Sequence, residues 1–206
     1  MALFNSCTST PLSVRYYLLH TPENKVSNTA LNVKPTSVKP ITAEPATTKL
    51  IAVLHSIDVA DYLRQSSLVM QVGQHQLHYS RQDVWAEELQ SSFYKALLQD
   101  LNATGQHNYI TSSSPNASQA ATTITIKLDH FHATDSSSVI SSGRYWLSVN
   151  AINPLKKNDS ASSSHSFFFE LELDQDGYAN AVKQLRSLIV TLSKQIETDM
   201  LALPNY

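Results

Sequence analysis

The stretch DYLRQSSLVMQVGQHQLHYSRQDVWAEELQSSFYKALLQDLNATG, residues 61–105, contains the strongest structural signals of the sequence. Its second half has an apolar residue at every fourth position, and further apolar residues widen the same face. The repeating residues are Trp85, Leu89, Phe93, Leu97 and Leu101. This spacing predicts a long amphipathic helix, which a sheet or another helix must cover.

The ends of this predicted helix carry residues that are typical of helix caps. Ser80 precedes Asp83 by three residues, which resembles a capping box with Asp in place of Glu. Asp83, Glu87 and Glu88 place negative charge near the helix N-terminus, where the helix dipole favours it. These carboxylates could also serve as catalytic acids or bases, but the helix start explains them better. Gly105 stands where a C-terminal cap is expected.

A second long helix is predicted at the end of the chain. Asp176-Gly177 marks its start and Pro204 its end, and a narrow apolar stripe with three-four spacing runs between them. The stripe comprises Tyr178, Val182, Leu185, Ile189, Leu192, Ile196, Met200 and Leu203. Such a stripe is compatible with a coiled-coil seam or with a helix buried along one side by a sheet. We favour the sheet.

Short apolar runs between polar segments predict strands. They cover residues 14–19, 50–57, 67–72, 76–79, 108–111, 122–131, 141–149 and 167–173. The third and fourth runs form a hairpin around Gly73-Gln74 that leads directly into the first helix. The run 122–131 alternates, and we expect Ile124, Ile126, Leu128 and His130 on one face.

This order of elements predicts the α/β (α+β) class: a single two-layer domain with one twisted mixed sheet, packed by two long helices on the same face. We expect the domain to occupy residues 15–203, after an N-terminal tether of residues 1–14. Residues 21–49 contain four prolines among Thr, Ser, Asn and Lys. Because no helix persists through such proline spacing, this segment is predicted to be a flexible connection.

Composition excludes several classes of function. The net charge is -2 and the basic residues are scattered, so nucleic acid is not expected as a partner. No apolar run approaches the length of a membrane-spanning helix. With only four glycines, the sequence contains no Gly-rich phosphate loop and no serine nucleophile elbow. We therefore expect no cofactor and no catalytic residues.

The sequence contains eight histidines, and because histidine is a common metal ligand, a metal site must be considered. His130 and His132 should project to the same side of a strand, and His75 and His78 lie at the predicted hairpin. None of these has the spacing of a structural zinc site, so ordinary surface and strand-edge histidines are the favoured interpretation and no metal is expected. The alternative is a small hydrolase or metal enzyme built around Asp129, His130 and His132.

Cys7 is the single cysteine, in a polar segment where a small buried hydrophobe would be out of place. Followed by Arg15-Tyr16-Tyr17-Leu18-Leu19, it resembles the start of PqiC-like lipoproteins, the auxiliary lipoprotein components of ABC-type intermembrane transport systems. Further segments match in order, Trp85–Leu89 being the most specific. They are Val59–Arg64, Leu68–Gln71, Trp85–Leu89, Ile126–Phe131, Gly143–Leu147 and Asp176–Tyr178.

The resemblance implies a non-catalytic lipoprotein on the periplasmic face of the outer membrane, with acyl chains attached at Cys7. Its implied partner is an MCE-domain (PqiB-like) periplasmic protein that carries phospholipid between the membranes. Several acyl chains give stable anchoring where one is marginal. No charged and apolar leader precedes Cys7, and we expect that it has been trimmed.

The alternative function is that of a periplasmic adaptor without a role in lipid transport. Such an adaptor would form a homo-oligomer through an exposed sheet edge or through the C-terminal helix. Both functions are compatible with an assembly of several copies.

Overall fold

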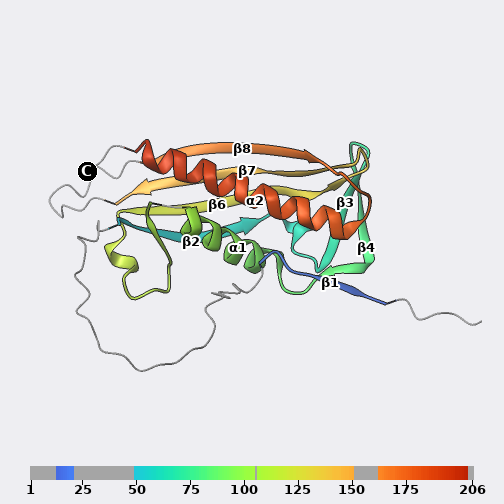
Figure 1. Ribbon diagram of the computed structural model, residues 1–206, viewed down its shortest axis with the longest axis horizontal. Coiled ribbons are helices and arrows are strands. Elements are labelled where there is room, and N and C mark those ends of the chain that lie inside the picture. The colour runs from blue at the N-terminus through green and yellow to red at the C-terminus, as the bar shows by residue number, and fades with distance from the viewer. Residues whose placement is uncertain (1–12, 21–48, 105, 151–161, 204–206) are drawn as a thin grey trace, which may run out of the picture.

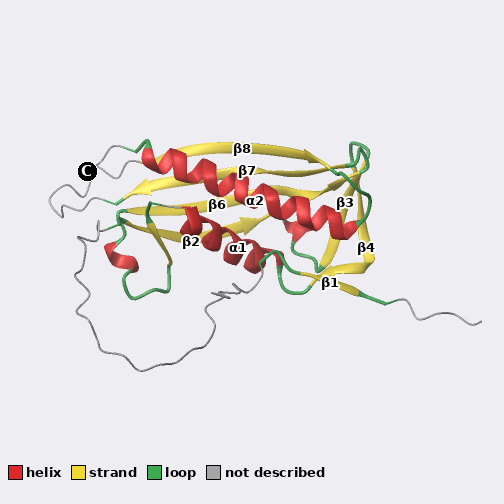
Figure 2. Cartoon of the chain, viewed as in Figure 1, coloured by secondary structure: helices red, strands yellow, loops and turns green. Residues whose placement is uncertain are grey.

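Two layers make up the structure: an eight-stranded mixed sheet and a pair of helices that lie side by side on one of its faces (Figures 1 and 2). This computed structural model describes residues 13–20, 49–104, 106–150 and 162–203. The predicted fold class is confirmed. The predicted tether up to residue 12 and the connection over residues 21–48 lie outside the described residues.

The sheet is organised around β6, which has neighbours on both edges. The strands are β1 (Arg15–Tyr17), β2 (Ile51–Val59), β3 (Ser67–Val72), β4 (Gln76–Trp85), β5 (Asn108–Thr111), β6 (Thr122–Thr134), β7 (Ser138–Val149) and β8 (Ser162–Glu172). One edge of β6 pairs in parallel first with β2 and then, at its end, with β3; the other edge pairs antiparallel with β7. The β3 branch continues through β4 to β1, whereas β8 lies beyond β7.

The core lies between the sheet and the helices α1 (Leu89–Thr104) and α2 (Tyr178–Leu201). From α1 it takes Phe93, Leu97 and Leu101, which are fully buried. The apolar stripe of α2 packs into the same core, so it is a buried side of a sheet-packed helix and not a coiled-coil seam. Arg186 ties the helices together, because its Nη2 donates to Asp100 Oδ1 at 2.6 Å.

The predicted start of the first helix is wrong. The helix begins at Leu89, and Trp85 instead ends β4, where it pairs with Tyr17 of β1. The backbone N–H groups of Gln82 and Asp83 donate to Ser80 Oγ at 3.3 and 2.9 Å, as in a helix cap. These hydrogen bonds lie within β4, at the point where the register of its pairing with β3 shifts, and not at the start of a helix.

The predicted inward face of β6 is wrong at His130. A bulge around Asp129 shifts the register between Leu128 and His130. As a result Phe131 faces the core, and His130 and His132 lie on the opposite face of the sheet. Gly143 of β7 pairs with Leu128 at this point, and a Cβ there would lie 2.1 Å from the Lys127 carbonyl oxygen.

The remaining strand bounds differ by a few residues. β4, β6 and β7 are longer than predicted, and β8 begins at Ser162 inside a segment that the sequence suggests is a Ser-rich loop. The alternation of β8 predicts Phe167, Phe169, Leu171 and Leu173 on its inward face. Phe167 is buried and Phe169 and Leu173 pack against the core, whereas Leu171 is exposed. The sequence of residues 58–63 predicts a turn or a single helical turn, and the structure has a short 3-10 helix there, η1 (Asp61–Leu63).

Candidate functional site

The edge strand β1 stands out as the place where the N-terminal segment joins the domain. It pairs in parallel with β4 at the end of the sheet order (Figure 1). Arg15 and Tyr17 point toward Asp83 of β4, and Leu19 is buried in the core. The alternate residues Val14, Tyr16 and Leu18 are 45, 70 and 47% exposed.

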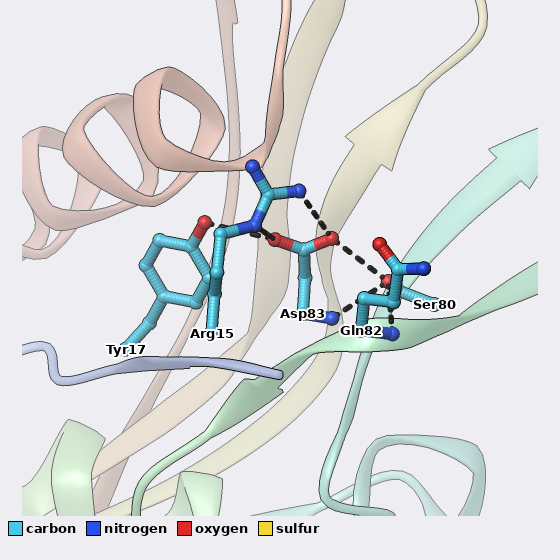
Figure 3. A network of polar contacts seen from close by, with 5 residues as sticks. All are labelled: Arg15, Tyr17, Ser80, Gln82 and Asp83. Carbon is cyan, nitrogen blue, oxygen red and sulfur yellow. Dashed lines mark hydrogen bonds and ion pairs between the residues drawn. The ribbon is translucent and has the colours of Figure 1, made fainter. Parts of the chain in front are cut away.

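The side chain of Asp83 clamps β1 to β4 (Figure 3). Arg15 approaches both carboxylate oxygens, with Nε 2.7 Å from Oδ1 and Nη2 2.9 Å from Oδ2. Tyr17 donates its hydroxyl hydrogen to Oδ1 at 2.9 Å, and Ser80 donates to Oδ2 at 3.0 Å. The Asp83 side chain is only 3% exposed, so protein groups replace the water it loses.

The surroundings keep Asp83 ionised. Burial acts to raise the pKa of its carboxyl, but the hydrogen bonds from Arg15, Tyr17 and Ser80 together lower that pKa below its usual value. Burial and the bond to Asp83 raise the pKa of the Tyr17 hydroxyl. With its oxygens occupied by these donors, Asp83 is suited to holding two strands together and not to proton transfer.

The predicted role of Asp83 at the helix start changes accordingly, whereas Glu87 and Glu88 directly precede α1, as expected. Asp83 is the clamp residue of a strand. Glu87 forms an ion pair with Lys95, and its Oε1 lies 3.2 Å from His20 Nδ1. Little in the sequence indicates that Arg15 and Tyr17 are the partners of Asp83, because the only signal is that two residues with polar ends alternate on the first strand.

A hollow of about 350 Å³ opens between the start of α2 and the β6–β7 turn. It is lined by Met70, Ala133, Thr134, Asp135, Ser137, Leu173, Asp176, Gly177, Tyr178 and Ala181. Asp135 Oδ2 accepts the backbone N–H of Gly73 at 2.7 Å, which connects the β3–β4 and β6–β7 turns. The hollow carries no cluster of catalytic groups.

His130 and His132 form an aromatic cluster with Tyr62 on the face of the sheet away from the helices. The ring centroid of Tyr62 lies 6.4 Å from that of His130 and 5.9 Å from that of His132, and its hydroxyl donates to the Asp129 carbonyl oxygen. His132 Nδ1 contacts the Ala133 carbonyl oxygen at 3.0 Å. Burial lowers the pKa of His132.

This cluster does not form a metal centre. Within the described parts of the chain, no group of three or more His, Cys, Asp or Glu side chains is placed to hold a metal ion. His75 and His78 lie exposed at the β3–β4 hairpin. The structure therefore brings together the two histidines of the hydrolase hypothesis but gives them no third ligand.

The predicted attachment site, Cys7, lies outside the described residues, and β1 begins eight positions after it. Neither described helix has the length and hydropathy that crossing a membrane requires.

Comparisons with known proteins identify related sequences and folds. The model of a family described as "ABC-type transport auxiliary lipoprotein component" matches residues 30–197. No curated protein matches the sequence. The crystal structure of an uncharacterized protein has a TM-score of 0.64 at 22% identity, covering 73% of this chain and 92% of that one.

Two further solved structures differ in how similar they are. A Xanthomonas campestris protein of family DUF330 has a TM-score of 0.56 at 9% identity, covering 74% of this chain and 85% of its own. A PelC dodecamer from Paraburkholderia phytofirmans reaches a TM-score of 0.41 at 8% identity, covering 70% and 86%. The first shares the fold; the second is too dissimilar to inform the assembly of this chain.

Proposed function

Because the chain belongs to the family of ABC-type transport auxiliary lipoprotein components, we propose that it is a non-catalytic subunit of an intermembrane phospholipid transport system. In this proposal acyl chains on Cys7 anchor it to the periplasmic face of the outer membrane, and the folded domain docks an MCE-domain periplasmic protein. The family match over residues 30–197 is the observation that carries the proposal.

The buried polar groups support a role without catalysis. Asp83 is occupied by donors from β1 and β4. Glu197 of α2 accepts hydrogen bonds from the Tyr109 hydroxyl and the Gln106 backbone, so it joins α2 to β5 and to the segment before it. Each of these carboxylates is used to hold two elements together, which leaves it unavailable for reaction with a substrate.

The position of β1 supports an anchor at Cys7. The tether between Cys7 and the first strand is short, and it enters a strand that is held in the sheet by the buried Asp83 carboxylate. A firmly attached first strand allows a lipid anchor to hold the whole domain, and not merely a loose end of the chain.

Expression of the gene with its native leader in a Gram-negative host tests the anchor. We expect the N-terminal peptide to carry acyl chains on Cys7, and the protein to sediment with outer membranes. The Cys7→Ser variant should be soluble in the periplasm. Unmodified Cys7 on exported, membrane-fractionated protein would refute the anchoring.

The docking step needs its own test. We expect the lipidated protein to retain an MCE-domain protein of the same organism in a pull-down with purified components. The Cys7→Ser protein should retain it as well, because docking uses the folded domain. Failure of both proteins to bind would exclude this partner.

A second candidate is supported by the free edge of β8. This strand pairs only with β7 among the described strands, it is long, and its Phe168 is 65% exposed. Long unpaired edges pair with other chains, which suits an oligomerising adaptor. Sedimentation of the natural protein and of Phe168→Lys tests this: an assembly that Phe168→Lys dissociates, in a protein that binds no MCE-domain partner, favours the adaptor.

A further inference from the structure

The row formed by Val14, Tyr16 and Leu18, here called the β1 row, is an exposed apolar strip. Its three side chains alternate along the chain with Arg15 and Tyr17, which point toward the Asp83 clamp. Each member of the row is more than two-fifths exposed. Single exposed apolar residues are ordinary, but here three alternate residues, one within β1 and one on either side of it, form a continuous surface that a partner can cover.

The short distance from Cys7 restricts what can lie against this row. Ser13 begins the described segment only six residues after Cys7, so even a fully extended chain spans no more than about 20 Å between them. The 24 residues of α2 alone extend over about 36 Å. Because the tether is shorter than the domain, the end of the domain that carries β1 stays next to whatever holds Cys7.

We propose that the β1 row rests on the lipid membrane that anchors Cys7, with its side chains at the boundary between headgroups and acyl chains. The inference rests on the proposed function, because it takes the acylated Cys7 as the anchor. It adds an orientation: the β1 edge faces the bilayer, and β8, at the opposite edge of the sheet, faces away.

The chemistry of the row suits this boundary. Tyr16 combines an apolar ring with a hydroxyl group, and such side chains gather at the headgroup level of membranes. The edge of β1 that pairs with no other described strand presents backbone N–H and C=O groups, which headgroups and interfacial water can satisfy but the hydrocarbon interior cannot. The β1 row therefore fits a shallow position at the surface, and it fixes orientation while the acyl chains supply the affinity.

A fluorescent label on the row tests the orientation. The lipidated full chain with Tyr16→Cys is labelled with an environment-sensitive thiol probe, since acylated Cys7 does not react. It is then placed in vesicles of phosphatidylethanolamine and phosphatidylglycerol, with and without doxyl-labelled lipid. Phe168→Cys is the matched control, because Phe168, like Tyr16, is an exposed aromatic residue in a strand at the edge of the sheet.

We expect a blue shift and quenching by doxyl lipid for the label at position 16, relative to the same label in soluble Cys7→Ser protein, and no change at position 168. An unshifted, unquenched label at position 16 overturns the inference, as does equal quenching at both positions. A label at position 16 that is already shielded in the soluble protein overturns it too, because another part of the chain then covers the row.

Mass spectrometry of the same samples separates this inference from the proposed function. Acylated Cys7 with a water-exposed label at position 16 refutes only the orientation. A protein that lacks acyl chains, and so takes up a second probe at Cys7, refutes the anchor itself.

Discussion

Arg15 and Asp83 are separated by 68 positions in the sequence, yet their side chains form a two-point ion pair between the first strand and the fourth. The Arg15 side chain is 59% exposed, so water can hydrate it when Asp83 is removed, but the Tyr17 and Ser80 hydroxyls lose their acceptor. Asp83→Ala should therefore lower the free energy of unfolding by about 2 kcal/mol. Asp58→Ala is the control, because the Asp58–Arg64 pair is exposed and should contribute less than about 1 kcal/mol. Urea denaturation measures both, and equal losses would contradict the clamp.

Acid should weaken the same clamp. The hydrogen bonds from Arg15, Tyr17 and Ser80 overcome burial and lower the pKa of Asp83 below the ordinary value of 3.8. Its contribution to stability is therefore present above that ordinary pKa and is lost as the pH falls through the lower, folded-state pKa. Asp83→Asn should show a shallower loss of stability below about pH 4 than the natural protein, measured by urea denaturation at stepped pH. Parallel curves would mean that Asp83 does not set this acid response.

The last turns of α2 are held on two sides by carboxylate–tyrosine pairs, Glu197 with Tyr109 and Asp199 with Tyr145. The side chain of Glu197 is 11% exposed and that of Asp199 26%, so water can replace a lost donor more easily at Asp199. We expect Tyr109→Phe to cost about 2 kcal/mol of stability and Tyr145→Phe about half of that. Hydrogen exchange of the α2 amides should rise in the first variant, and a larger effect in the second would reverse this ranking.

Gly143 should tolerate no side chain. An added Cβ would lie 2.1 Å from the Lys127 carbonyl oxygen in the neighbouring strand, where the β6 bulge brings the two backbones together. Gly143→Ala should therefore destabilise the domain by about 3 kcal/mol, as overpacking does. Arg144→Ala, at the adjacent exposed position, is the control and should have a small effect on the thermal midpoint. A Gly143→Ala protein as stable as Arg144→Ala would show that the strands can separate at no cost.

His132 should make stability depend on pH nearer neutrality. Burial, the largest influence, lowers the pKa of this side chain below 6.5. Between the two pKa values His132 is protonated in the unfolded chain but neutral in the folded protein. The free energy of unfolding therefore declines as the pH falls from about 6.5 toward the folded-state pKa. His132→Gln should flatten this decline, whereas His78→Gln, on the exposed hairpin, should keep it. Denaturation at pH 7 and pH 5 compares them, and an unchanged slope in His132→Gln would exclude His132 as the cause.

The sequence predicts the layers of this fold but not the way in which distant strands join. The stripe of α2 is periodic over many turns, and its burial against the sheet follows directly. Trp85 belongs to the same every-fourth series as Leu89 and Phe93, yet its backbone pairs with Tyr17. That pairing depends on a strand more than sixty positions away, which no local pattern reports.

The same reason explains the error at His130. Strict alternation along β6 predicts an inward His130, and a single extra residue at Asp129 reverses the faces that follow it. The bulge is accommodated by Gly143 on β7, whose missing side chain allows the close approach. Similarly, the Asp83 clamp needs Arg15 and Tyr17 together, whereas the local sequence around Asp83 suggests only a helix cap.

In the proposed protein with acylated Cys7, the pairing of β1 with β4 sets how far the domain can lie from the membrane. While β1 is paired with β4, the tether extends from Cys7 to Arg15 and spans at most about 28 Å. If β1 left the sheet, the tether would extend from Cys7 to Ile51 and span up to about 150 Å. In the proposed anchored protein, the three residues of β1 and the buried Asp83 carboxylate thus keep the domain at the membrane surface. Without their pairing, the chain between the anchor and the domain could become more than five times as long.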